Sequence, residues 1–330
     1  MKFSIFSVVD HYPAELTRSV DRFYQELLEQ AVAAEELGFH GFWIAEHHFH
    51  EYGAIPRPSI WMASAAERTK TLRLGSAVTL LPLDHPLRVA EDYAMVDVLS
   101  GGRLDLGVGS GYLKHEFDGF DMTLADKRER FDESLEILTR ALSGERFSYE
   151  GTYWNIKDVA LNVLPVQKPA PPMWIAVLRN EAAPFVGKRG LPIMMIPYAS
   201  TENFEELANT LSSFRTAYEG ATGKSEVDLP FGMHTCIADD AKTAEAKGRE
   251  AMDRYVRTRL YAKQRSFETL VEKDLIAFGS SEDMVRIAKR YKTAGFNHFM
   301  TLANFGGMSH EKTLDTMERM AKEVIPHFQD

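Results

Sequence analysis

Residues 41–53 read GFWIAEHHFHEYG, and this stretch carries two signals in direct succession. Gly41–Ala45 has the apolar and aromatic content of a buried β-strand. The residues that follow are polar and titratable, with Glu46, His47, His48 and His50 close together. The chain has 11 histidines, so three of them after one strand indicate either a functional site or a polar loop. The order of strands and helices in the rest of the chain decides between the two.

Seven further segments have the composition of buried strands. The eight expected strands are Phe3–Val9, Gly41–Ala45, Leu72–Leu81, Leu104–Val108, Met173–Val177, Ile193–Ile196, Phe231–Ile237 and His298–Leu302. Strands that are apolar throughout and separated by helices pair in parallel, with both faces covered. Eight such units predict an α/β protein, a closed (β/α)8 TIM barrel that forms a single domain over residues 1–330.

Apolar residues spaced by three and four predict amphipathic helices between these strands. The clearest sets are Phe23, Leu27, Ala31 and Ala34; then Phe131, Leu135, Leu138 and Leu142; and finally Leu314, Met317, Ala321 and Val324. We expect these helices to end at Gly38, Gly144 and Pro326. Residues 145–172 and 263–278 do not fit a minimal barrel, and we expect loop insertions there that form lids or dimer elements.

A doubly wound open sheet is the alternative architecture, and its dinucleotide-binding form carries a G-x-G-x-x-G pattern after the first strand. The nearest match is GVGSGY at residues 107–112. Its glycines have a different spacing and follow the fourth expected strand. The sequence therefore favours the barrel.

The composition limits the class of protein. The hydrophobic content of 45% and the charged content of 26% are typical of a soluble globular protein. The net charge of −10 argues against a nucleic-acid partner. The single cysteine, Cys236, suits a reducing cytoplasm. The start of the chain lacks a secretory pattern, and no apolar run is long enough to span a membrane, so we expect a cytoplasmic protein with no membrane partner.

Active sites of barrels lie at the carboxyl ends of the strands, where Glu46, His47 and His48 fall. One interpretation is a metal site, because the spacing His48-x-His50 is similar to that of barrel metallohydrolases. The ends of the fifth and eighth strands supply no further ligand, so we expect no metal. The other interpretation is acid–base chemistry, since a histidine can exchange a proton near neutral pH.

Three long motifs then resemble one family, the bacterial luciferase-like flavin monooxygenases. They are AEHHFHEYG at 45–53, GSAVTLLPLDHPLRVAEDYAMVDVLSGGRLDLGVGSGY at 75–112, and NFGGMSHEKTLDTMERMAKEVIPHF at 304–328. The resemblance implies a (β/α)8 barrel, a reduced FMN cofactor delivered by a separate flavin reductase, and a homodimer. It also implies activation of O2 and oxygenation of a small organic substrate.

The resemblance assigns roles after the second and in the third strand. His47 matches the family's catalytic histidine, with acid–base work at the flavin, and Glu46 and His48 would orient it. His50 and Tyr52 could be plain loop residues. Ala77 and Val78 fall where the family has a cis peptide bond that supports the flavin ring, although an ordinary buried strand would also explain them.

The segment GVGSGYLKHEF at 107–117 departs from the family in two places. Ser110 stands where some members bind the flavin phosphate with an arginine, and Gly109 stands where the family has a reactive cysteine. The amides around Gly109, Gly111 and Tyr112 can still donate hydrogen bonds to a phosphate. We expect Cys236 to be a small core residue instead.

Two other segments could supply the missing charge. Arg128 aligns with a family phosphate ligand, and a bound dianion would favour a cation in the first turn of a helix. The alternative is a solvated charge run, with Glu129 and Asp132 as partners of Arg128. Leu178 and Arg179 follow the fifth strand, where the family binds phosphate, and we expect Arg179 to offset the arginine absent at Ser110.

Three other functions remain open at this stage. A deazaflavin-dependent dehydrogenase or reductase would use the same barrel, with a histidine accepting a proton during hydride transfer. A non-catalytic flavin-binding subunit would have no chemical need of His47. A metallohydrolase lacks the further ligands that it needs.

Overall fold

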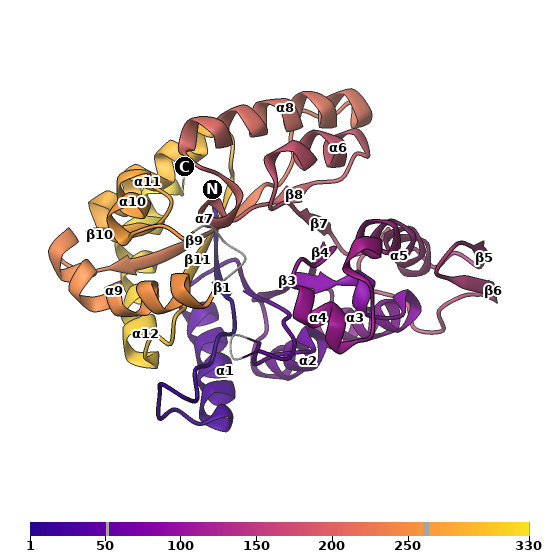
Figure 1. The fold of residues 1–330 in the computed structure, drawn as a ribbon, viewed down its shortest axis with the longest axis horizontal. Helices are drawn as coiled ribbons and strands as arrows, with labels where there is room; N and C mark the ends of the chain where they lie inside the picture. Colours follow the sequence, from indigo (N-terminus) through magenta and orange to yellow (C-terminus); the bar gives the residue numbers. More distant parts are fainter. Residues whose placement is uncertain (51–52, 260–263, 330) are drawn as a thin grey trace.

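The computed structural model describes residues 1–50, 53–259 and 264–329. Its centre is a nine-stranded parallel sheet with the strand order β10-β9-β11-β1-β2-β3-β4-β7-β8 (Figure 1). The strands are β1 (Lys2–Ser7), β2 (Gly41–Ile44), β3 (Arg73–Leu80), β4 (Leu104–Gly109), β7 (Met173–Ala176), β8 (Ile193–Met194), β9 (Pro230–Ile237), β10 (Ala277–Gly279) and β11 (His298–Asn304). The predicted α/β class and the parallel pairing are confirmed.

The sheet curls so that the residue after β8 meets β9. The backbone N–H of Met195 donates to the carbonyl of Pro230 at 3.2 Å, and the N–H of Gly232 donates to the carbonyl of Met195 at 2.9 Å. These bonds link the β8 edge of the sheet to a strand near its other edge. The carboxyl ends of the strands thus surround a common interior.

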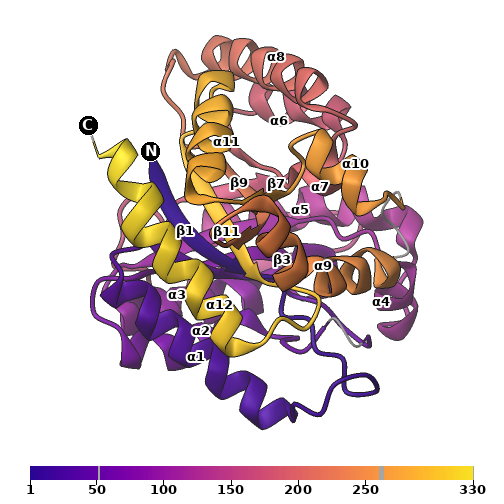
Figure 2. The same cartoon turned by 90° about the vertical axis from the view of Figure 1, so that its left-hand side faces the viewer.

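The longer helices cover the outer face of the curled sheet (Figures 1 and 2). Helices follow most strands. They are α1 (Val20–Glu36), α2 (Pro58–Arg68), α3 (Pro86–Ser100), α4 (Lys114–Gly119), α5 (Lys127–Leu142), α6 (Ala183–Lys188), α7 (Pro197–Ser200), α8 (Phe204–Thr222), α9 (Ala241–Thr258), α10 (Phe267–Glu272), α11 (Ser281–Ala294) and α12 (His310–Arg319). Within the described residues, no helix is both long and apolar enough to cross a membrane.

Two of the three predicted helix ends are confirmed. Gly38 and Gly144 follow α1 and α5 with φ angles of +81° and +84°, which glycine adopts without a Cβ clash. The prediction for Pro326 was wrong. After α12 the chain continues as a π-helical turn over Met320–Val324 and a 3-10 turn over Ile325–Phe328. Pro326 is the second residue of that last turn, where a missing N–H is tolerated.

All eight expected strands are present, although their ends differ. The first ends at Ser7 instead of Val9, because Val9 has a φ angle of +53°, outside the β region. The sequence did not reveal β10, which has three residues and pairs with the end of β9. So short a strand carries no periodicity signal.

The two irregular stretches contain structure of their own. Residues 145–172 include an antiparallel hairpin of β5 (Phe147–Glu150) and β6 (Asn155–Val159), which projects away from the main sheet (Figure 1). Residues 264–278 include α10 and the start of β10. Tyr52 and Lys263 lie outside the described residues.

The sheet interior is filled tightly around Trp43. Its side chain is fully buried, and its ring centroid lies 5.4 Å from that of Trp174 in an edge-to-face arrangement. Gly75 is the register partner of Trp43 on β3, and a Cβ atom there would lie 2.1 Å from Cδ2 of the indole. Gly75 is therefore required for a large side chain to fit between β2 and β3.

We predict that Gly75→Ala destabilises the protein, because the new methyl group must displace a buried indole. Overpacking of a core costs about 1–3 kcal/mol of unfolding free energy. Gly220→Ala is the control, since a Cβ at this helical position of α8 meets nothing within 4 Å and should stabilise the fold slightly. Chemical denaturation of both variants checks this, and equal midpoints would contradict it.

Candidate active site

The three titratable residues after β2 come together with a carboxylate from the loop after β4. Nδ1 of His47 lies 3.0 Å from Oε1 of Glu116, which belongs to α4. The same oxygen accepts the backbone N–H of His48 at 3.0 Å. Nε2 of His48 lies 3.1 Å from Oε1 of Glu46. The sequence stretch therefore forms two histidine–carboxylate pairs, both buried.

Gly53 packs directly against the backbone of His47. A Cβ atom at Gly53 would lie 2.9 Å from the carbonyl carbon of His47, so only glycine allows this approach. The His48 ring packs edge-to-face on Phe120, at 4.9 Å between centroids. Backbone and ring contacts thus fix both imidazoles, as acid–base chemistry requires.

Burial dominates the electrostatics of these pairs. It lowers the pKa of His47, and the neighbouring Glu116 carboxylate opposes this shift. It raises the pKa of Glu46, against the effect of the His48 hydrogen bond. His47 is therefore neutral at neutral pH. When Nδ1 carries the ring proton and donates a hydrogen bond to Glu116, Nε2 is the basic nitrogen that can accept a proton.

Sequence reasoning missed Glu116, although it quoted the segment that contains it. Parallel strands place the loops that follow β2 and β4 at the same edge of the sheet. A carboxylate in the short helix after β4 was therefore the signal that could have identified Glu116 as a partner of His47. His50, by contrast, is exposed, and its ring centroid lies 5.5 Å from that of His115.

The residues expected beneath a flavin ring also lie together. The peptide bond between Ala77 and Val78 is cis, as the resemblance implied. A Cβ atom at Gly109 would lie 2.6 Å from Cγ2 of Val78 and 3.8 Å from Cβ of Ala176. Val78 therefore occupies the space that a cysteine at position 109 would need. Cys236 is buried on β9, as expected, and burial raises its pKa to about 11.

The loop after β4 approaches the same region. Gly111 has a φ angle of +69°, and a Cβ atom there would lie 3.0 Å from the Phe117 ring. The Tyr112 ring faces His47 edge-on, at 6.5 Å between centroids. Ser110 is half-buried. The glycines at 109 and 111 make this loop compact enough for its amides to approach a ligand.

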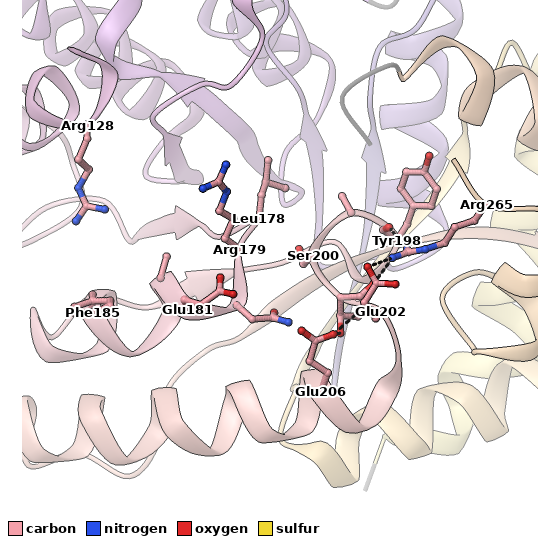
Figure 3. Close-up of a pocket in the computed structure, with 14 residues that line it drawn as sticks. Arg128, Leu178, Arg179, Glu181, Phe185, Tyr198, Ser200, Glu202, Glu206 and Arg265 are labelled. Carbon is pink, nitrogen blue, oxygen red and sulfur yellow. Dashed lines mark hydrogen bonds and ion pairs between the residues drawn. The ribbon is translucent and has the colours of Figure 1, made fainter. Parts of the chain in front are cut away.

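The predicted phosphate residues Arg128, Leu178 and Arg179 line one cavity of about 710 Å³ (Figure 3). Arg179 follows β7, and its exposed side chain donates no hydrogen bond to any residue in the described part of the chain. Nε of Arg128 donates to Asp132 at 2.9 Å, so the local pairing expected for a solvated charge run is also present. Ser110 does not line this cavity.

Sequence reasoning missed two further cations near this cavity. Nζ of Lys127 donates to the carbonyl of Gly111 at 3.2 Å, and burial together with the charge of Arg179 lowers its pKa. Arg265 lines the other end and donates to the carbonyls of Tyr198 and Thr201 at 2.9 and 3.0 Å. Lys127 thus adds positive charge beside Arg179, while Arg265 ties α7 to the segment before α10.

Comparison with known proteins places this architecture in a family. Residues 1–277 match the luciferase-like monooxygenase family. The crystal structure of the monooxygenase RslO1 from Streptomyces bottropensis is 30% identical, covers 99% of this chain and 100% of its own, and superposes with a TM-score of 0.92.

Two relatives show the range of cofactors among similar proteins. The oxygenase component of a flavin-dependent trigonelline monooxygenase from Acinetobacter baylyi is 25% identical over 100% of this chain and 96% of its own. An F420-dependent glucose-6-phosphate dehydrogenase from Amycolatopsis mediterranei is 24% identical over 92% of this chain and 94% of its own.

Three observations point to the same family: the curled parallel sheet, the histidine–carboxylate pairs at its carboxyl edge, and these matches. The protein belongs to the luciferase-like monooxygenase family, whose members here include flavin-dependent monooxygenases and F420-dependent dehydrogenases. These matches support an oxidoreductase.

We predict that Glu116→Gln lowers the pKa of His47, because the variant removes the negative charge that favours the imidazolium. An NMR titration of the His47 ring measures this shift. Glu46→Gln is the matched control, because Glu46 bonds His48 and should leave the His47 titration nearly unchanged. A higher or unchanged pKa of His47 in Glu116→Gln would show that Glu116 does not set its protonation.

Proposed function

We propose that this protein is the oxygenase component of an FMN-dependent monooxygenase, which uses reduced FMN and O2 to oxidise a small organic substrate. The observation that carries the proposal is the buried His47–Glu116 pair at the carboxyl edge of the curled sheet. The flavin-dependent relative supports it, since that protein is also an oxygenase component. A separate flavin reductase would then supply the reduced cofactor.

The residues on two sides of the site fit FMN. Arg179, with Lys127 and Arg128 beside it, offers cations for a phosphate group at the cavity after β7. The Ala77–Val78 peptide packs against Gly109 on the neighbouring strand, so short groups from β3 and β4 would face the ring. When bound, reduced FMN supplies the electrons that activate O2.

The chain's own groups would move protons and exclude water. Nε2 of His47 is the basic nitrogen that accepts a proton and returns it. Glu116 holds the tautomer by accepting from Nδ1, and the Glu46–His48 pair fixes the loop from the other side. Because all four side chains are buried, their hydrogen bonds are stronger than they would be in water.

We further propose the assembly and setting in which this site works. The link between Met195 and β9 would complete a (β/α)8 barrel within a single domain. A homodimer would cover the apolar side chains that α2 and α3 expose, namely Ile60, Met95, Val98 and Leu99. The cytoplasm is a suitable compartment, because the chain's single cysteine is a free thiol.

Anaerobic titration with reduced FMN, followed by mixing with O2, tests the function. We expect tight binding and a measurable delay before oxidised flavin appears, and a shorter delay in His47→Ala. His50→Ala is the matched control, because His50 is exposed, and should keep the delay of the wild type. Parallel titration with reduced F420 tests the dehydrogenase alternative.

The outcomes separate the alternatives. Binding of F420 but not of FMN would overturn the proposal in favour of the dehydrogenase. Tight FMN binding with immediate oxidation, unaffected by His47→Ala, would indicate a non-catalytic flavin-binding protein.

Arg179→Ala tests the proposed phosphate site. A charge-assisted hydrogen bond contributes about 1.5–3 kcal/mol, so FMN should bind roughly 10- to 100-fold more weakly. Riboflavin lacks the phosphate and should bind the variant and the wild type equally well. Arg146→Ala is the control, because Arg146 pairs with Asp158 in the β5–β6 hairpin, outside the cavity lining. Unchanged FMN affinity would exclude Arg179 as the phosphate ligand.

A further inference from the structure

One buried histidine has no part in the chemistry described above. His234 lies in the middle of β9 and is completely buried. Neither ring nitrogen has a hydrogen-bond partner among the residues that the structure describes. Burial lowers its pKa to about 3, so the ring is neutral at physiological pH. A neutral imidazole carries one N–H donor and one acceptor nitrogen.

The strand pattern directs this ring into the interior. A Cβ atom at Gly232 would lie 2.9 Å from Leu302, 3.1 Å from Phe6 and 3.4 Å from Ile196, which come from β11, β1 and the segment after β8. Side chains two residues apart on a strand point to the same face. His234 therefore points inward like Gly232, one step closer to the carboxyl edge where His47 lies.

Aromatic rings surround His234. The centroids of Tyr255, Phe305 and Tyr198 lie 4.3, 5.2 and 5.3 Å from its own. The Tyr198 hydroxyl is also buried, and it too has no hydrogen-bond partner within the described residues. Tyr198 lines the cavity of Figure 3 as well, so this aromatic cluster borders the proposed cofactor site.

Two buried polar groups without partners are costly in an interior that apolar side chains could fill. A buried donor or acceptor that lacks a partner loses the hydration that it has in the unfolded chain. Functional sites are where such groups recur, because a ligand supplies the missing partner. The charge of Arg259 also lowers the pKa of His234, and this guanidinium lies 3.7 Å from the carboxylate of Asp10, so the local cation already faces an anion. This part of the interior therefore suits a ligand without net charge.

We propose that His234 and Tyr198 form the polar end of the substrate site and bind the carbonyl oxygen of a small, uncharged aromatic or alicyclic compound. The N–H of His234 and the O–H of Tyr198 are two donors for one acceptor oxygen. The surrounding rings supply the apolar walls for the substrate's own ring. The proposal rests on the proposed function and adds a substrate class to it.

A pair of probes of equal shape tests this assignment. Acetophenone and α-methylstyrene differ only in the replacement of a carbonyl oxygen by a CH2 group. Their dissociation constants are measured by NMR titration on the FMN-loaded protein, without turnover. We expect the wild type to bind acetophenone at least tenfold more tightly than α-methylstyrene.

Variants identify the residues responsible. His234→Leu should bring the ratio of the two dissociation constants close to one, because only the binding of acetophenone becomes weaker. His234→Gln should restore part of this ratio. Tyr198→Phe, which removes only the hydroxyl, should lower the ratio several-fold. His40→Leu removes a half-buried histidine at the amino-terminal end of the sheet and should leave the ratio unchanged. If His234→Leu fails to fold, His234→Gln and Tyr198→Phe still decide.

The failures are distinguishable. A ratio near one in the wild type, no binding of either probe, or a ratio that His234→Gln and Tyr198→Phe leave intact would overturn this inference. None of these results bears on FMN binding or on the delay in flavin oxidation, which are measured on the same variants. Another outcome is a wild type that shows no delay before oxidised flavin appears but keeps a ratio of dissociation constants that depends on His234. That result would overturn the proposed function and still support His234 as part of a binding site.

Discussion

The contact between Nδ1 of His47 and the carboxylate of Glu116 is the interaction on which the site depends. It joins the loop after β2 to the loop after β4, and the same oxygen also accepts the backbone of His48. Burial alone would keep His47 neutral and leave its ring orientation unspecified. The carboxylate fixes the tautomer and opposes the burial shift, so one contact sets both the geometry and the basicity of the histidine.

The curled parallel sheet makes this contact available, because it brings the ends of separate strands to one edge. The side chains in its interior become smaller toward the carboxyl edge. The bulk of Trp43 sits against Gly75, while Gly109 and Ala176 keep the ends of β4 and β7 small. Gly109 lets Val78 pack closely against it, and these short groups would form the surface under a flat cofactor, above a densely filled core.

Much of this arrangement could be predicted from the sequence, and the omissions have physical reasons. Long apolar strands and the glycine helix ends are local signals, so the α/β class and the titratable loop after β2 followed from them. Glu116, Lys127 and Arg265 were missed because their importance depends on loops that meet only in three dimensions. The three-residue β10 and the turns around Pro326 were missed because a few residues carry too little pattern.

The polar groups near the site divide into two zones with different electrostatics. Around the cavity after β7, Lys127 and Arg179 leave positive charge, and burial together with the charge of Arg179 lowers the pKa of Lys127. In the other zone the His234 ring is neutral, and the nearby charge of Arg259 faces that of Asp10. Tyr198 borders both zones. Two molecules can thus be held side by side. One with an anionic end suits the cavity after β7, and an uncharged one suits the zone around His234.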